Sequence, residues 1–259
     1  MTIPIGIAGI AGRMGQLLAD ETAAAGATLA GGLVRAGSAP PSGPTFLTED
    51  ADALFPRCRA VIDFTHASAA AAHAAAAARH KVALILGTSG LSPSDEADVA
   101  DAARHVPVVY AANFAPGVNL VLALAERMAA ALPGTAYDAE ILEMHHRQKV
   151  DAPSGTAIAL GRAVAKGRGT TLDAAGRESG RDGHTGPRGS GTIGFAALRG
   201  GQVVGEHQLI FAAASEHIVL THRSFDRRAY ATGAVRAALW AADRPPGLYT
   251  MADVLGMRA

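Results

Sequence analysis

The sequence predicts an α/β fold, in which a doubly wound parallel sheet is joined to a second, α+β domain. Near the start, a buried-strand run at residues 3–7 leads into the glycine-rich turn 9–15 and then into a helical pattern, and this strand–helix alternation continues. Beyond the middle of the chain, strand-like runs at 192–198, 203–211 and 217–222 follow one another with short turns. Alternating strands and helices indicate a parallel sheet of the Rossmann type, and successive strands indicate an antiparallel part.

Length and composition exclude several protein classes. The 259 residues allow one large or two modest domains, and 23 basic against 23 acidic residues suggest neither a nucleic-acid partner nor an anionic membrane surface. The single cysteine, Cys58, excludes an internal disulfide and a cysteine-rich metal site. No run approaches the ~18 apolar residues of a membrane span, and the first residues lack the charged start of a signal peptide. We expect a cytoplasmic protein that does not bind a membrane.

The first strand, residues 3–7, ends in glycines with the spacing G-x-x-G-x-x-G. Glycines allow a tight turn and a close approach of the backbone to a pyrophosphate, which would rest on the N-terminus of the next helix. A glycine-rich turn that binds no ligand is the alternative. The candidate cofactor contacts here are Gly9, Ile10, Ala11, Gly12, Arg13 and Met14.

The second strand, residues 29–34, indicates which dinucleotide would bind. An NAD site usually has Asp or Glu about twenty residues beyond the glycines, to accept from the ribose 2′-hydroxyl. Here Val34 is followed by Arg35, and an arginine pairs well with a 2′-phosphate. We therefore predict a preference for NADPH, with NADH possible; an ordinary loop arginine is the alternative.

Three further apolar runs, at residues 60–64, 82–86 and 106–111, predict the remaining strands of this sheet. The alanine-rich stretch 67–78 predicts a helix, because alanine is the best helix former. Loops of small residues follow the strands, at the edge where parallel sheets bind their ligands.

The chemistry of the sequence is concentrated in residues 143–157. Two imidazoles, a guanidinium and an ammonium group fall within residues 145–149, and a Pro-Ser-Gly-Thr turn then leads into a helical pattern. Ser154 is a favoured N-cap type, so the N–H groups of residues 155–157 would form an anion site beside the basic cluster. The crowding of positive groups around Lys149 would make it readier to release a proton. A solvated loop before an ordinary helix is the alternative, whereas adjacent histidines do not have zinc-ligand spacing.

The later part of the chain predicts two more helices and a loop. Residues 118–132 and 230–242 have helical periods, and the helix after Ser154 would run to about residue 166. Residues 167–191 are too rich in glycine for a core element and predict a mobile loop at the border of the site. His184 and Arg188 on this loop are expected to be solvated, so neither is a candidate site residue.

Residues 143–157 match the pattern E-x-H-H-x-x-K-x-D-x-P-S-G-T at every fixed position. This pattern resembles the signature of the 4-hydroxy-tetrahydrodipicolinate reductase family, formerly called dihydrodipicolinate reductase. Other stretches typical of that family occur in the family's order, among them residues 63–65, 87–90, 112–114 and 184–195. The resemblance implies NAD(P)H-dependent reduction of 4-hydroxy-tetrahydrodipicolinate, with loss of water, in the diaminopimelate route of lysine biosynthesis.

The resemblance also implies residue roles and an assembly. His145 would be the acid/base residue and Lys149 the proton donor, while Ser154 would mainly cap its helix. The dicarboxylate substrate would be held by His146, Gly155 and Thr156. Loops bordering the nicotinamide would supply Gly87, Thr88, Ser89, Ala111, Ala112, Asn113 and Phe114, although Phe114 is equally compatible with an ordinary core position.

The same resemblance implies two domains and a homotetramer. Residues 1–117 and 226–259 would form a discontinuous dinucleotide-binding domain, and residues 118–225 a domain for substrate binding and oligomerisation. Two other functions remain open. A different amino-acid or imine dehydrogenase could share this layout, although the central signature argues against it. A dinucleotide-binding sensor without turnover is the other, and intact His145 and Lys149 argue against that.

Overall fold

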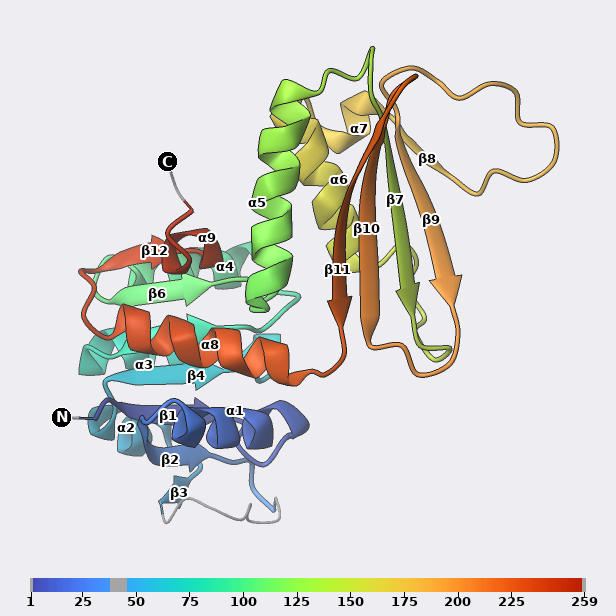
Figure 1. The fold of residues 1–259 in the computed structure, drawn as a ribbon. Helices are drawn as coiled ribbons and strands as arrows, with labels where there is room; N and C mark the ends of the chain where they lie inside the picture. The colour runs from blue at the N-terminus through green and yellow to red at the C-terminus, as the bar shows by residue number, and fades with distance from the viewer. Residues whose placement is uncertain (1, 38–45, 258–259) are drawn as a thin grey trace. The chain divides into compact units, whose positions relative to one another are not determined.

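The computed structural model describes residues 2–37 and 46–257, and the chain divides into two compact units (Figure 1). Unit 1 comprises Met1–Pro116 and Arg228–Ala259, and unit 2 comprises Gly117–Arg227. Within the described residues, none of the helices has the length and apolar character needed to cross a bilayer.

Unit 1 is built on a parallel sheet with the strand order β12-β6-β5-β4-β1-β2-β3. The chain starts at the centre with β1, builds outward through β2 and β3, and then returns to the other side of β1. This reversal is the topological switch point at which open α/β sheets bind ligands. The strands are β1 (Pro4–Ala8), β2 (Thr28–Leu33), β3 (Leu47–Thr48), β4 (Ala60–Asp63), β5 (Ala83–Leu86), β6 (Pro107–Tyr110) and β12 (Gly247–Tyr249).

Helices cover both faces of this sheet, as a doubly wound fold requires. On one face Ile7 and Ile62 pack with α1 and α8, and on the other Val61 and Leu84 pack with α3 and α4. Alternate strand residues thus enter opposite cores, which confirms the predicted Rossmann-type fold. The helices are α1 (Arg13–Ala24), α2 (Ala51–Leu54), the 3-10 turn η1 (Phe55–Arg57), α3 (Ala67–His80), α4 (Pro93–Ala102), α8 (Arg228–Ala241) and α9 (Met251–Val254).

Unit 2 is a mixed sheet in the order β11-β10-β7-β9-β8, with α5, α6 and α7 packed on one face (Figure 1). Its core joins inward residues of β7 and β10 to the apolar side of α6. The elements are α5 (Pro116–Ala131), β7 (Asp138–His145), α6 (Gly155–Gly167), α7 (Leu172–Ala175), β8 (Arg177–Ser179), β9 (Ile193–Arg199), β10 (Gly205–Ala212) and β11 (His217–Ser224).

The pairing of β9 differs from the sequence prediction. The β10–β11 hairpin is antiparallel as predicted, but β9 and β10 are not neighbours, because β7 lies between them. The α6–α7 crossover returns the chain to the same end of the sheet, so β9 joins β7 in parallel. Only the other edge of β7 then remains for β10.

The first half of the glycine-rich stretch 167–191 contains regular structure that the prediction of a loop did not include. It contains α7 and the edge strand β8, and β8 pairs in parallel with the start of β9. The prediction that Arg188 is solvated was wrong. Its side chain is 16% exposed and binds the carboxylates of Asp138 and Glu140 at 2.9 and 2.8 Å. It also donates to the backbone carbonyls of Ala139 and Thr192. His184 is exposed.

Candidate active site

The candidate cofactor site of unit 1 begins at the turn between β1 and α1. Gly9 has φ +75°, a conformation that favours glycine, and the N–H of Gly9 donates to the Leu33 carbonyl at 3.1 Å. A Cβ at Gly15 would lie 2.4 Å from the Gly9 carbonyl oxygen, so α1 can approach the turn only without that side chain. No side chain caps α1 at Gly12. This start of α1 fits a pyrophosphate, which the positive helix end and its N–H groups would hold.

Arg35 lies where a dinucleotide site reads the ribose. It follows β2 and Val34, whose N–H donates to the Thr48 carbonyl at 3.0 Å. The Arg35 side chain is exposed. In the part of the chain that the structure describes, no acidic side chain pairs with Arg35, and this guanidinium is compatible with a 2′-phosphate.

The other candidate cofactor loops follow β5 and β6 at the same edge of the sheet. The N–H of Gly87 donates to the Asp63 carbonyl at 2.9 Å, and the N–H of Ala111 to the Leu86 carbonyl at 3.3 Å. These loops therefore begin side by side. Thr88 is buried, and its hydroxyl has no hydrogen-bond partner among the described residues. Ser89 and Ala112 lie on the same two loops.

Two residues of these loops have structural contacts. Phe114 is 1% exposed, lies in the core of unit 1 and packs on Phe64 with ring centroids 5.4 Å apart. Its side chain is therefore a core side chain, the alternative that the sequence left open. The Asn113 side chain accepts from the N–H of Ala115 at 2.8 Å and so shapes the turn before α5.

In unit 2, the candidate catalytic residue His145 ends strand β7. Because strand residues alternate between faces, Glu143 and His145 point to the same side, and His145 Nδ1 lies 2.5 Å from Glu143 Oε2. Arg199 binds both oxygens of the Glu143 carboxylate at 2.8 Å. His145 is half-buried, and its ring meets that of His207 edge to face at 5.1 Å.

Lys149 lies in the turn after β7, where its N–H donates to the His146 carbonyl at 3.1 Å. Its Nζ forms an ion pair with Asp151 Oδ1 at 2.8 Å, and its side chain is 20% exposed. The ammonium group is close enough to His145 to help lower the pKa of that imidazole. His146 Nδ1 is buried and has no partner in the described part of the chain.

The helix that follows has the predicted cap. Ser154 is 2% exposed and its hydroxyl accepts from the N–H of Ala157 at 3.2 Å, so its N-cap role is confirmed. The same hydroxyl contacts His207 Nε2 at 3.0 Å. A Cβ at Gly155 would meet nothing within 4 Å, so the space in front of this residue is open. Gly155 and Thr156 form the first turn of α6, which can receive a carboxylate there.

The charges of this cluster shift three pKa values. Burial would raise the pKa of Glu143, but hydrogen bonds from Arg199, His145 and the Ser154 N–H outweigh it and lower the pKa. Burial lowers the pKa of His145, and hydrogen bonding to Glu143 only partly opposes this. Burial also lowers the pKa of His207 to about 4. At neutral pH the cluster therefore combines an ionised carboxylate with neutral imidazoles.

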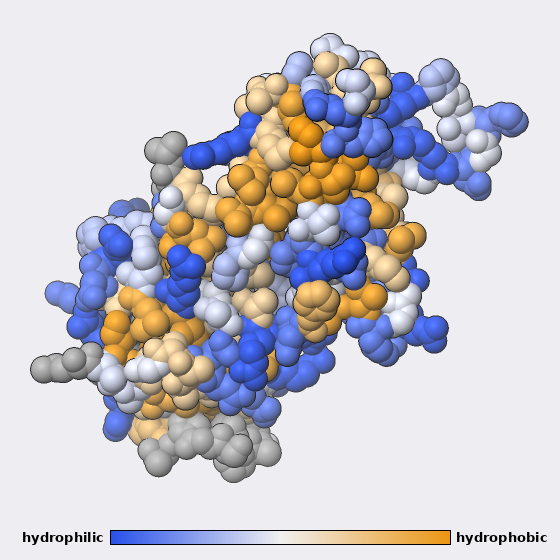
Figure 2. All heavy atoms as spheres, in the orientation of Figure 1, coloured by the Kyte–Doolittle hydropathy of each residue, from blue (hydrophilic) through white to orange (hydrophobic). Residues whose placement is uncertain are grey.

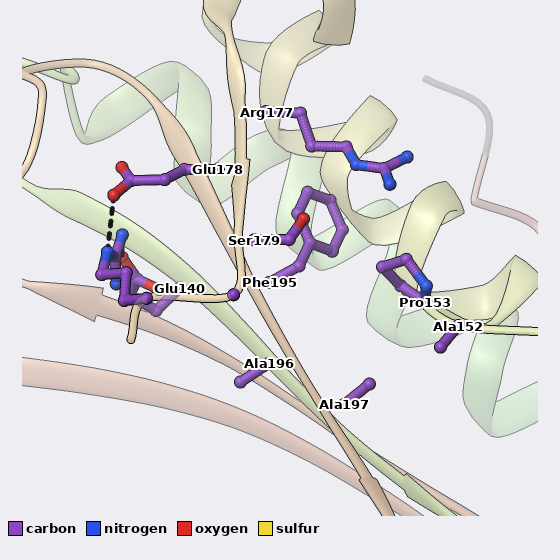
Figure 3. Close-up of a pocket in the computed structure, with 11 residues that line it drawn as sticks. Glu140, Ala152, Pro153, Arg177, Glu178, Ser179, Phe195, Ala196 and Ala197 are labelled. Carbon is purple, nitrogen blue, oxygen red and sulfur yellow. Dashed lines mark hydrogen bonds and ion pairs between the residues drawn. The ribbon is translucent and has the colours of Figure 1, made fainter. Parts of the chain in front are cut away.

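A separate cavity of about 480 Å³ lies along β8 and β9 in unit 2 (Figure 3). Figure 3 shows Arg177, Phe195 and Pro153 on one side of the strands and Glu140 and Glu178 on the other. Neither His145 nor Lys149 lines this cavity. Its size alone does not make it the reaction site, because the candidate catalytic residues His145 and Lys149 are not among its lining residues.

Sequence reasoning missed two contributors to the His145 cluster. Arg199 was not a candidate, although it ends a strand and precedes two glycines. His207 was not a candidate either, although it lies in a strand that the sequence predicted. No local pattern indicated that β9 pairs with β7, and this pairing is what places Arg199 against Glu143.

Comparison with known families gives two adjoining matches. The family described as "Dihydrodipicolinate reductase, N-terminus" matches residues 3–114, and "Dihydrodipicolinate reductase, C-terminus" matches residues 117–255. The chain belongs to the dihydrodipicolinate reductase family. The resemblance drawn from residues 143–157 is thereby confirmed.

Relatives of this family align along nearly the whole chain. The 4-hydroxy-tetrahydrodipicolinate reductase of Granulibacter bethesdensis is 66% identical, over 99% of this chain and 98% of the relative. The enzyme of the same name from Gluconacetobacter diazotrophicus is 60% identical, over 98% of each chain. Nearly full coverage on both sides means that these relatives match both units of this chain.

Solved structures agree on the fold. A dipicolinate-bound dihydrodipicolinate reductase from Paenisporosarcina sp. TG-14 has a TM-score of 0.81 at 22% identity, over 96% of this chain and 98% of that one. A probable dehydrogenase from Thermotoga maritima has a TM-score of 0.60 at 12% identity, over 98% and 93% of the two chains. The higher score thus belongs to a member of the dihydrodipicolinate reductase family.

Proposed function

We propose that this chain reduces 4-hydroxy-tetrahydrodipicolinate to tetrahydrodipicolinate, with loss of water, in the diaminopimelate route of lysine biosynthesis. The observation that carries the proposal is the arrangement of unit 2, where His145 and Lys149 directly precede the open start of α6. Proton-transfer groups next to an anion site suit a dicarboxylate ring that must be held and protonated. The names of the close relatives support the same reaction.

Unit 2 would bind and protonate the substrate. The first turn of α6, at Gly155 and Thr156, would hold a carboxylate together with the neighbouring His146. When bound, a nicotinamide cofactor supplies the hydride. Negative charge that develops on the ring would be neutralised by a proton from Lys149, with His145 as the acid/base residue. The lowered pKa of His145 keeps its imidazole neutral at neutral pH, so the ammonium group of Lys149 is the better proton donor.

Unit 1 would hold the cofactor, and Arg35 would make NADPH the preferred one. The pyrophosphate would rest on the turn from Gly9 to Met14, at the start of α1. The candidate loops after β5 and β6 would border the nicotinamide. An exposed guanidinium after β2, with no acidic side chain paired to it among the described residues, supports a 2′-phosphate over a 2′-hydroxyl.

The test is cofactor oxidation by the full chain, with substrate formed in situ from pyruvate and aspartate semialdehyde. We expect oxidation that depends on substrate, with NADPH used more efficiently than NADH. Absence of oxidation above the uncatalysed rate with either cofactor would contradict the reaction and favour a dinucleotide sensor.

The cofactor preference is tested separately by Arg35→Ala. Loss of a charged hydrogen bond should raise the KM for NADPH roughly 10-fold or more and leave the KM for NADH nearly unchanged. The control is Arg104→Ala, an exposed arginine of unit 1 paired with Asp101. Equal effects of Arg35→Ala on both cofactors would overturn the proposed preference.

We also propose a homotetramer assembled through the sheet of unit 2. The sheet face opposite α6 includes Leu198 and Val219, each 48% exposed, and no described helix covers that face. Figure 2 shows hydrophobic side chains over α5, which packs on the helix-covered face of unit 2 and is not part of this sheet surface. Sedimentation velocity should give a single tetrameric species, and Val219→Glu should shift it toward smaller species. A monomer at all concentrations would contradict the assembly.

A further inference from the structure

The carboxylate of the signature residue Glu143 accepts hydrogen bonds at both oxygens, although the proposed reaction assigns this residue no role. It is 1% exposed and receives four hydrogen-bond contacts. Arg199 contributes two at 2.8 Å, His145 Nδ1 lies at 2.5 Å, and the Ser154 N–H donates to Oε1 at 3.1 Å. One oxygen faces the catalytic histidine and the other faces the residue that caps α6.

Strand geometry places these partners around Glu143. Parallel pairing of β7 with β9 sets Arg199 beside His145, two residues along the strand from Glu143 and therefore on the same face of the sheet. Antiparallel pairing of β7 with β10 sets His207 directly opposite Glu143. Glu143 is thus enclosed by its own strand and by both neighbouring strands. A buried carboxylate is costly unless it is paired and hydrogen-bonded, and here both conditions are met.

The contact at His145 Nδ1 determines which nitrogen of that ring is available. A carboxylate only accepts, so Nδ1 must carry the hydrogen of this bond. In the neutral ring Nε2 is then the unprotonated nitrogen. Nε2 lies beside Gly205, where a Cβ would come within 3.1 Å of it. The absence of a side chain at Gly205 therefore leaves room at the nitrogen that would exchange protons.

We propose that Glu143, held by Arg199, is a positioning residue. One oxygen of its carboxylate fixes the tautomer and orientation of the His145 ring, and the other holds the backbone at the start of α6. The proposal rests on the proposed function for its effect on turnover. Arg199 also donates to the Asp151 carbonyl at 2.6 Å, which connects the loop containing Lys149 to the Glu143–Arg199 pair. Glu143 and Arg199 would thereby fix the relative placement of the acid/base residue and the carboxylate-binding turn.

Four charged or titratable groups face His145, and they make the proposal measurable. These are Glu143 on β7, Lys149 in the following turn, Arg199 on β9 and His207 on β10. Glu143 favours the imidazolium, whereas Lys149 and Arg199 oppose it. Removal of the Glu143 charge should therefore lower the pKa of His145, and removal of the Arg199 charge should raise it. A general loosening of the fold would not produce opposite shifts.

The experiment titrates His145 by NMR in the full chain labelled with 15N at histidine, with His145→Gln to assign the signal. We expect the neutral ring to be protonated at Nδ1 in the wild type. The titration midpoint should fall in Glu143→Gln and rise in Arg199→Gln. The control is Glu140→Gln, a β7 carboxylate on the opposite face that also pairs with arginines, and it should leave the midpoint unchanged.

Turnover provides the second readout. Glu143→Gln should lower kcat by roughly 10²-fold or more, as expected when an acid/base histidine loses the carboxylate that orients it. Wild-type kcat and an unmoved His145 midpoint in Glu143→Gln would overturn the proposal. If Glu143→Gln does not fold, the Arg199→Gln variant tests the proposal instead. A His145 titration midpoint that is unchanged or lower in Arg199→Gln would contradict the positioning role of the Glu143–Arg199 pair.

The two readouts separate this proposal from the proposed reaction. The NMR titration needs no substrate, so it tests the positioning role of Glu143 even if the wild type fails to oxidise cofactor. If the wild type turns over while Glu143→Gln behaves like Glu140→Gln, the reaction stands and the positioning role fails.

Discussion

At the scale of single residues, Gly205 shows how a missing side chain keeps the outer edge of His145 clear. A Cβ there would lie 3.1 Å from Nε2 and 3.4 Å from Cδ2 of the imidazole, tighter than ordinary contacts. Gly205→Ala should push the ring by a few tenths of an ångström and lower kcat about 10-fold, since small misplacements of catalytic groups are costly.

The matched control for Gly205→Ala is Gly200→Ala. A Cβ at Gly200 would meet only the flexible end of Met144, at 3.1 Å. Gly200→Ala should therefore retain nearly full kcat. Steady-state kinetics on both proteins, after circular dichroism has established that each is folded, measure the difference. Equal kcat values for the two variants would show that the space beside Nε2 does not matter.

Residue identities were more predictable than residue partners. The resemblance of residues 143–157 to the family signature selected His145 and Lys149 as candidates, and the position of Ser154 ahead of a helical pattern predicted the helix cap. It could not predict that Glu143 binds Arg199, because that contact depends on the parallel pairing of β7 with β9. A pairing between strands separated by a long crossover leaves no local signal in either strand.

At the scale of elements, helix α3 ends in an unfavourable backbone conformation. Its C-cap, Lys81, has φ +56° and ψ +46°, the left-handed region that favours glycine. Lys81→Gly should raise the free energy of unfolding by roughly 0.5–1 kcal/mol. Urea denaturation is the measurement, and Ala78→Gly inside the same helix should instead lower the free energy of unfolding by about 1 kcal/mol. A loss of stability in Lys81→Gly would contradict the backbone argument.

Periodicity predicted the long elements well and the short ones poorly. The helices α5, α6 and α8 begin and end within a few residues of their predictions, because each has an apolar side that repeats over several turns. The strand β8 was missed because Arg177–Ser179 is short and carries two charged residues. It becomes a strand only by pairing with β9, which no local pattern reveals.

At the scale of the whole molecule, buried histidines should make stability depend on pH. Burial lowers the pKa of His207 from 6.5 to about 4. Between these two pH values, His207 binds a proton in the unfolded chain but stays neutral in the folded chain. Stability should therefore fall as the pH decreases from 6.5 to 4, by at most about 3 kcal/mol from this residue.

Urea unfolding at a series of pH values measures this dependence. His207→Gln should flatten the decline between pH 6.5 and 4, although it loses some stability at neutral pH through the Ser154 contact. His217→Gln, at an exposed position on β11, should leave the profile of the wild type unchanged. An equally steep decline in His207→Gln would show that other groups cause the acid sensitivity.

The central proposal for unit 2 is that Lys149 donates the proton and that the start of α6 binds a substrate carboxylate. It is tested most directly by measuring kcat and KM side by side for Lys149→Ala and His146→Gln, with Lys166→Ala on α6 as the control lysine. We predict that Lys149→Ala lowers kcat by about 10²- to 10⁴-fold with KM nearly unchanged, and that His146→Gln mainly raises KM. Wild-type kcat in Lys149→Ala, or a loss confined to KM, would contradict Lys149 as the proton donor.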